Sequence, residues 1–97
     1  MSTKIFYIEI TSNELRSKLK LKKKKRGRTL CYFKYDVETA QGKEKKKLFS
    51  LGLDEVKELF LDASISRSSF EIFEIIKIGE PLVRVTHKLF ETVYFGN

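Results

Sequence analysis

The chain has 97 residues, a single cysteine and a formal net charge of +7. Its length predicts one domain spanning residues 1–97, and a hydrophobic fraction of 41% excludes a disordered chain. One cysteine excludes an intramolecular disulfide and indicates a reducing compartment.

The beginning of the chain lacks the small-residue cleavage pattern of a signal peptide. The sequence contains no apolar run of the roughly eighteen residues needed to cross a bilayer. We therefore expect an intracellular, soluble protein. Membrane association is not favoured, because the basic clusters adjoin strand-like sequence rather than an amphipathic helix.

The first half of the chain begins with residues 4–10, whose Ile, Phe and Tyr predict a strand. Residues 11–14 have capping-box spacing, which predicts a helix over residues 12–24 with Leu15 and Leu19 on one face. The alternation of Lys and Leu over residues 18–22 predicts a strand instead. Both alternatives remain open for this segment.

Residues 28–37 form the clearest predicted strand, and residues 45–51 return as its partner after a hairpin connection at residues 38–43. Two sets of side chains alternate along the first strand. We expect the more apolar set to face the core: Thr29, Cys31, Phe33, Tyr35 and Val37. The set expected to be open to solvent is Leu30, Tyr32, Lys34 and Asp36.

Gly52 occupies the N-cap of a predicted amphipathic helix at about residues 53–63. A polar loop at residues 64–69 precedes a strand at 70–78 and a turn at 79–81, and residues 82–95 supply one long strand or two short ones. The predicted fold is α+β. An antiparallel sheet of about four or five strands packs against this helix, with a possible second helix at 12–24.

Two basic clusters hold twelve of the twenty Lys and Arg residues, with Glu44 as the one acid between their members. This concentration of charge is typical of proteins that bind a polyanion. The alternative is that the lysine runs are solvated loops. The first cluster contains Lys18, Lys20, Lys22, Lys23, Lys24, Lys25, Arg26 and Arg28, and the second contains Lys43, Lys45, Lys46 and Lys47.

Residues suited to catalysis are sparse. His87 is the single histidine, in a strand-like stretch, and no Cys–His group has metal-binding spacing. The five glycines are scattered and form no phosphate-binding loop. We assign Cys31 to the core and the carboxylates Asp54, Glu55, Glu58 and Asp62 to the solvent side of their helix. We therefore expect no enzymatic activity, no cofactor and no metal.

The basic clusters flank the ends of the predicted hairpin, roughly 25–30 Å apart at about 3.3 Å per residue. Tyr32 and Lys34 lie between them, although Tyr32 has the alternative role of packing on a neighbouring element. Basic ends with an aromatic middle suit an unpaired strand, whose phosphates bind lysine and whose bases stack on rings. The predicted binding residues are Lys22, Lys23, Lys24, Lys25, Arg26, Arg28, Tyr32, Lys34, Lys43, Lys45, Lys46 and Lys47.

Residues 26–30, RGRTL, precede a strand, and residues 48–51, LFSL, run directly into the acidic helix start at residues 52–59, GLDEVKEL. This order resembles the single-stranded-DNA-binding domain of the transcriptional coactivator called positive cofactor four, over about residues 18–63. The resemblance implies a homodimer that presents basic β-ridges to melted DNA. It places Arg26, Arg28, Lys34, Lys46 and Lys47 against DNA, although Val56 stands where many members have tryptophan.

Two alternatives to single-stranded DNA remain. A helix at 12–24 would give the order strand, helix, strand, strand, helix, strand, which is the ferredoxin-like pattern of many RNA-binding domains. The second alternative is a small phage or plasmid factor that docks on a host protein through apolar C-terminal strands. Independently of both, the surplus of apolar residues in so short a chain predicts a homodimer.

Overall fold

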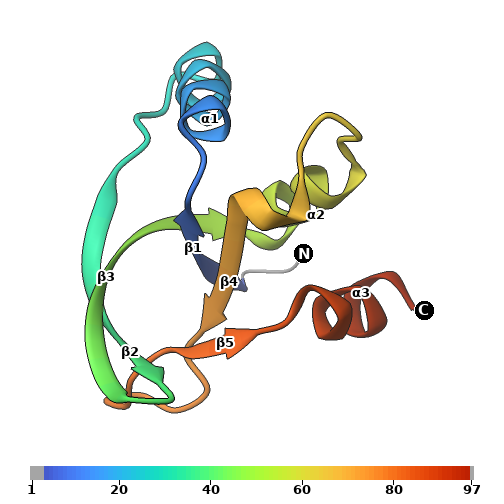
Figure 1. Cartoon of the computed structure of the whole chain (residues 1–97). Helices are drawn as coiled ribbons and strands as arrows, with labels where there is room; N and C mark the ends of the chain where they lie inside the picture. The colour runs from blue at the N-terminus through green and yellow to red at the C-terminus, as the bar shows by residue number, and fades with distance from the viewer. Residues whose placement is uncertain (1–3, 97) are drawn as a thin grey trace.

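A computed structural model describes residues 4–96, so part of the segment searched for a signal peptide, residues 1–3, lies outside the described residues, as does residue 97. Five strands and three α-helices follow one another along the chain (Figure 1). The elements are β1 (Ile5–Ile10), α1 (Asn13–Lys25), β2 (Tyr32–Thr39), β3 (Gly42–Gly52), α2 (Leu53–Leu61), the 3₁₀ turn η1 (Arg67–Ser69), β4 (Phe70–Glu74), β5 (Val83–Val85) and α3 (His87–Phe95).

The strands form one antiparallel sheet in the order β2-β3-β1-β4-β5. The sheet bends so strongly that its two edges meet at one end (Figure 1). There the Leu82 N–H donates to the Asp36 carbonyl at 3.1 Å, and the Glu38 N–H donates to the Leu82 carbonyl at 3.1 Å. The β2–β3 hairpin is therefore a curved ribbon with an outer and an inner side.

The three helices share the main core cluster with one face of the sheet. Phe6, Ile8 and Ile10 alternate along β1 toward this cluster and are at most 4% exposed. On the other face of the sheet, a second cluster of Val37, Leu48, Phe73 and Leu82 fills the inside of the bend, and the half-buried Tyr7 and Tyr35 pack against it. Both faces of the sheet are thus packed, but the inner one only near the bend.

The predicted α+β class and antiparallel sheet are confirmed. Residues 13–25 are helical, and Leu15 and Leu19 are buried. The N-cap is Ser12, which accepts from the Leu15 N–H at 3.3 Å, and not Thr11 as the capping-box spacing of residues 11–14 predicts. The Thr11 hydroxyl instead donates to the Ser68 carbonyl at 2.8 Å. The competing strand prediction fails because Leu21 is 62% exposed. With α1 present, the strands and α-helices from β1 to β4 have the ferredoxin-like order, followed by β5 and α3.

The prediction for α2 also holds at its start, where the Gly52 N–H donates to the Glu55 side chain at 3.2 Å. The predicted hairpin is present and tighter than expected, since Thr39 pairs with Gly42 and leaves residues 40–41 as the loop. Gly42 has a φ of 117°, a conformation that favours glycine and turns the chain here.

The predicted strand at 28–37 is wrong in its first part, because β2 begins at Tyr32. Residues 28–31 leave the end of α1 through a turn at Gly27, whose φ is 73°, and have to reach the sheet before they can pair. Three residues assigned to the core, Thr29, Cys31 and Phe33, are consequently exposed. Of the predicted core face, Val37 is buried and Tyr35 is half-buried.

The predictions for the C-terminal part are also corrected. The strand expected at 70–78 ends at Glu74, and residues 82–95 form the short β5 and the helix α3 instead of strands. The Thr86 side chain caps α3, and Phe90 and Tyr94, one helical turn apart, both pack edge-on against Phe6. The strand prediction is wrong here because it uses the β-branched and aromatic content of the segment and not the helical spacing of its apolar residues.

Candidate nucleic-acid interface

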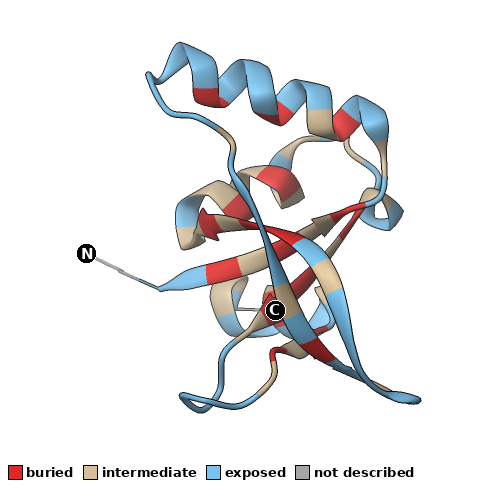
Figure 2. Cartoon of the chain, turned by 90° about the vertical axis from the view of Figure 1, so that its left-hand side faces the viewer, coloured by how far each residue is buried: buried red, intermediate tan, exposed pale blue. Residues whose placement is uncertain are grey.

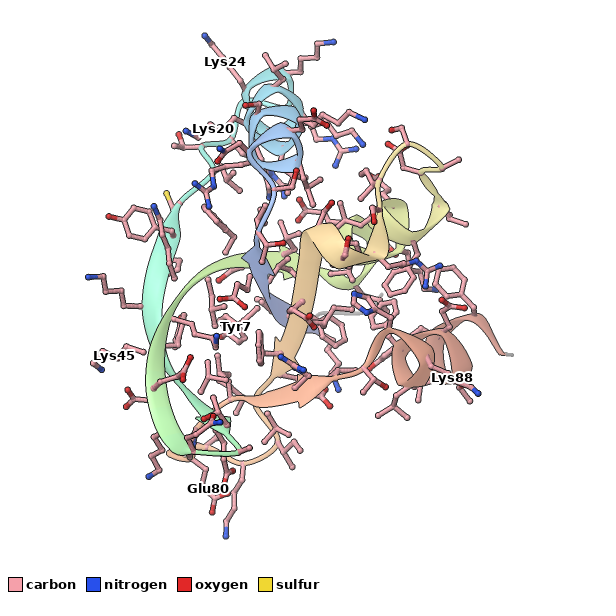
Figure 3. The ribbon with its side chains drawn as sticks, in the orientation of Figure 1. Tyr7, Lys20, Lys24, Lys45, Glu80 and Lys88 are labelled. Atoms are coloured by element: carbon pink, nitrogen blue, oxygen red, sulfur yellow. The ribbon has the colours of Figure 1, made fainter. Side chains whose placement is uncertain are left out.

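The outer face of the β2–β3 hairpin carries the side chains opposite to the inner cluster. The strand register places Tyr32 beside Phe49, Lys34 beside Lys47 and Asp36 beside Lys45. In Figure 3, Lys45 points away from the bend while Tyr7 points into it. Because side chains alternate along a strand, the outer face comprises Tyr32, Lys34, Asp36, Glu38, Lys43, Lys45 and Lys47, all of which are exposed.

The charges of this outer face are dominated by lysine. Lys45 forms an ion pair with Asp36 at 2.9 Å. Within residues 4–96, no carboxylate lies in ion-pair distance of Lys34, Lys43 or Lys47. Like charges directly opposite on neighbouring strands repel each other, so the Lys34–Lys47 pair favours a bound anion.

Tyr32 provides an aromatic ring within this lysine cluster. Its side chain is 53% exposed, and its ring meets Phe49 edge-on with 6.4 Å between centroids. The ammonium of Lys47 lies over the Tyr32 ring, 4.0 Å from its centroid. The alternative that Tyr32 only packs on a neighbour is met in part, because its ring forms an edge-to-face pair with Phe49 while the side chain remains exposed.

Helix α1 adds lysines next to this face. Leu15, Leu19 and Lys23 form the buried side of α1, and the rest of the helix is largely exposed (Figure 2). Figure 3 shows Lys20 and Lys24 on the side of α1 that lies toward β2. Lys20 was not among the predicted binding residues, yet its i,i+4 spacing from Lys24 indicates a shared helix face. Of the other predicted positions on α1, Lys22 and Lys25 are exposed.

Three predicted binding residues are directed toward helix α2 instead. Lys23 is 8% exposed, and its Nζ lies 2.6 Å from a carboxylate oxygen of Glu55. Arg26 donates to Glu58 at 3.1 Å, and Arg28 lies 4.0 Å from Glu55. The prediction that Glu55 faces solvent is therefore wrong, because α1 packs beside it, whereas the Glu58 side chain remains 43% exposed.

The Glu55 carboxyl shows how closely α1 and α2 are coupled. Burial alone would raise its pKa, but the hydrogen bonds from Lys23 and the Gly52 N–H, with the charges of Lys23 and Arg28, outweigh this effect. The pKa of Glu55 is consequently held below its ordinary value. Glu55 thus acts as both a helix cap and an ion-pair partner.

Lys46 lies on the inner face of the hairpin. Its Nζ is 3.0 Å from Glu44 and 3.4 Å from Glu9, and the hydrogen bond to Glu44 is the main reason that the pKa of Lys46 is raised. The five DNA-facing positions implied by the resemblance are therefore divided. Lys34 and Lys47 share the outer face, Lys46 points inward, and the two arginines point toward α2.

Other parts of the surface are less suited to a polyanion. A hollow of about 470 Å³ inside the bend is lined by two cations, Lys46 and Arg84, and by two acids, Glu38 and Glu44.

His87 lies in the first turn of α3, with Nε2 2.9 Å from the Phe70 carbonyl oxygen. Residues 4–96 contain no cluster of three or more side chains that could hold a metal.

Comparison with protein-family models, curated protein sequences and solved structures finds no significant match to this chain. Across the described residues, no helix combines the length and apolar character needed to cross a membrane.

Proposed function

We propose that the protein is a non-catalytic module that binds single-stranded DNA with little dependence on base sequence. The bound strand follows the outer face of the β2–β3 hairpin toward α1. Lys20, Lys24, Lys34 and Lys47 bind its phosphates and Tyr32 stacks against a base. Such a module serves as an accessory factor in transcription, replication or recombination, and it resembles positive cofactor four in this respect.

The observation that carries the proposal is the opposition of Lys34 and Lys47 beside an exposed tyrosine ring. Two ammonium groups side by side without a carboxylate destabilise the free protein slightly. A phosphate between them removes this repulsion and releases counterions from the strand. The ring beside them provides a surface for an unpaired base, which a duplex does not offer.

Duplex DNA fits the interface less well. The exposed residues in the last turns of α1 are lysines and Leu21, and they include none of the Asn, Gln or Arg side chains that commonly distinguish base edges in the major groove. Lysine contacts to phosphate position a protein on nucleic acid without reading its sequence. We therefore expect weak dependence on base sequence.

The proposal is tested by fluorescence anisotropy with labelled single-stranded DNA, duplex DNA and single-stranded RNA of one sequence, each measured at several salt concentrations. We expect single-stranded DNA to bind most tightly, with an affinity that falls steeply as salt rises. Equal or tighter binding of the duplex at the same salt concentration would contradict the proposal.

RNA is the second candidate ligand, and the element order favours it. The ferredoxin-like succession from β1 to β4, with the sheet order β2-β3-β1-β4, is common among RNA-binding domains. Tighter binding of the RNA than of the matching DNA in the same titration would assign the interface to RNA.

We also propose self-association, but fewer apolar side chains are exposed to support it than the sequence suggested. Most apolar residues of the C-terminal part are buried within one chain, including Phe70, Ile72, Phe73 and Phe90. The exposed ones are Ile75, Ile76, Ile78, Leu89 and Val93. Light scattering distinguishes a monomer of 11.4 kDa from a dimer of twice that mass. Docking on a host protein would have to use the same exposed apolar side chains, and its binding would be insensitive to salt.

A further inference from the structure

The contact between Lys47 and Tyr32 has a consequence for what the interface accepts. In the free protein, the Lys47 ammonium lies 4.0 Å from the centroid of the Tyr32 ring. It therefore covers a ring face against which a base would have to stack. The ring also forms an edge-to-face pair with Phe49, so a base that stacks on the face covered by the lysine has to displace the Lys47 ammonium.

We infer that Tyr32 and Lys47 form a gated base-stacking position, which selects strands bearing unpaired bases over polyanions that lack them. This inference rests on the proposed function. A phosphate draws the Lys47 ammonium away from the ring, and the neighbouring base then occupies the vacated face. A polyanion without bases draws the lysine away as well but leaves the ring bare.

The register explains why Lys47 leaves the ring when an anion arrives. Lys34 lies directly opposite Lys47, and no carboxylate within the described residues pairs with either of them. An attraction between an exposed ammonium and a ring is weaker than the stacking of a base on a ring. Replacement of the Lys47 ammonium by a base on the Tyr32 ring is therefore favourable, because Lys47 gains a phosphate contact at the same time.

Tyr32 is distinguished from the other rings of the hairpin. Phe33 is similarly exposed, at 46%, but lies on the inner face with its ring 5.9 Å from that of Tyr35. The nearest lysine on that side along the register, Lys46, is already paired with Glu9 and Glu44. Phe33 is thus a matched control, because it has comparable size and exposure but lacks an available cation.

The test compares an oligothymidylate with an abasic phosphodiester strand of the same length and label, binding at one salt concentration. We expect the wild-type protein to bind the oligothymidylate about tenfold more tightly. Tyr32→Leu should weaken this probe by about tenfold and leave the abasic strand within about twofold, so that the preference disappears. Tyr32→Phe should keep the preference, and Phe33→Leu should leave both affinities within about twofold.

Lys47→Gln tests the gate. The variant loses the same phosphate contact and the same lysine–ring contact with either probe, so both affinities should weaken by a similar factor and the preference for the oligothymidylate should stay within about twofold of the wild-type ratio. Equal weakening of both probes by Tyr32→Leu, or loss of the preference in Lys47→Gln, would overturn the inference while leaving strand binding in place. Failure of the folded wild-type protein to bind either probe would instead remove the proposed function, and the inference with it. Circular dichroism confirms the fold of each variant.

Discussion

The outer and inner faces of the β2–β3 hairpin are built from alternate residues of the same two strands, yet they differ in nearly every physical property. Lys45 and Lys47 are exposed on the outer face, whereas Lys46 between them points inward and is held by Glu44 and Glu9. The outer face offers unpaired ammonium groups, and the inner face is closed by an apolar cluster. A run of lysines therefore does not measure binding capacity, because the pleat sends neighbouring charges into different environments.

Helix α1 repeats this contrast within a few residues. Lys23 is buried against Glu55, while Lys24, the next residue, projects to solvent beside the outer face (Figure 3). One side of the helix stabilises the fold and the other adds positive charge to the surface.

Leu48→Ala should cause the largest change. Leu48 is fully buried in the inner cluster, so its truncation should lower the free energy of unfolding by about 2–5 kcal/mol. The adjacent Lys47→Ala on the outer face should change it by less than about 0.5 kcal/mol. Urea unfolding followed by circular dichroism measures both. Similar losses for the two variants would show that the faces do not divide packing from binding.

The triple variant Lys34→Gln, Lys45→Gln, Lys47→Gln should bind single-stranded DNA weakly. Two of these lysines, Lys34 and Lys47, contact phosphates in the proposal, so with about 0.7 lost per contact the slope of log affinity against log salt should flatten by about 1.4, equivalent to up to about twenty-five-fold at about 0.1 M salt. Lys46→Gln is the matched control from the inner face and should keep the wild-type slope. A slope reduced as much by Lys46→Gln would contradict the assignment of the outer face.

Glu55→Gln tests the coupling of α1 to α2. Since the pKa of Glu55 is held below its ordinary value of 4.5, the carboxylate contributes stability above that pH and loses it as the pH falls through the lowered pKa. At neutral pH the variant should be less stable by about 1 kcal/mol, a partly exposed carboxylate being screened by solvent. The difference from wild type should shrink steadily below about pH 4.5; a difference independent of pH would refute the ionic origin.

Glu58→Gln should have the smallest effect of these variants, and it should raise the affinity for single-stranded DNA instead of lowering it. Glu58 holds Arg26 at 3.1 Å in an ion pair that is about half exposed on both sides, at 50% and 43%. Its removal should free Arg26 for a phosphate and raise the affinity for single-stranded DNA by about two- to fivefold, with little change in stability. An unchanged affinity and salt slope would place Arg26 outside the path of the strand.

The sequence by itself determined the elements whose signals are local. Gly52 with Glu55, the Ser12 cap and the hairpin ending at Gly42 are all set by side-chain and backbone preferences within a few residues, and each appears in the structure. The exposure of Tyr32 and Lys34 on one face of β2 likewise follows from the period of two in a strand. α3 had a local signal as well, but its aromatic and β-branched residues suggested a strand.

Tertiary structure alone decided which charges remain available. Lys23, Arg26 and Arg28 belong to one basic run in the sequence, but the packing of α1 beside α2 brings Glu55 and Glu58 to them from about thirty positions along the chain. The bend of the sheet likewise closes β2 against Leu82 and gives the hairpin an inside and an outside. Because ion pairing and burial depend on distances between segments remote in sequence, the composition of a basic cluster fixes its charge but not how much of that charge a ligand meets.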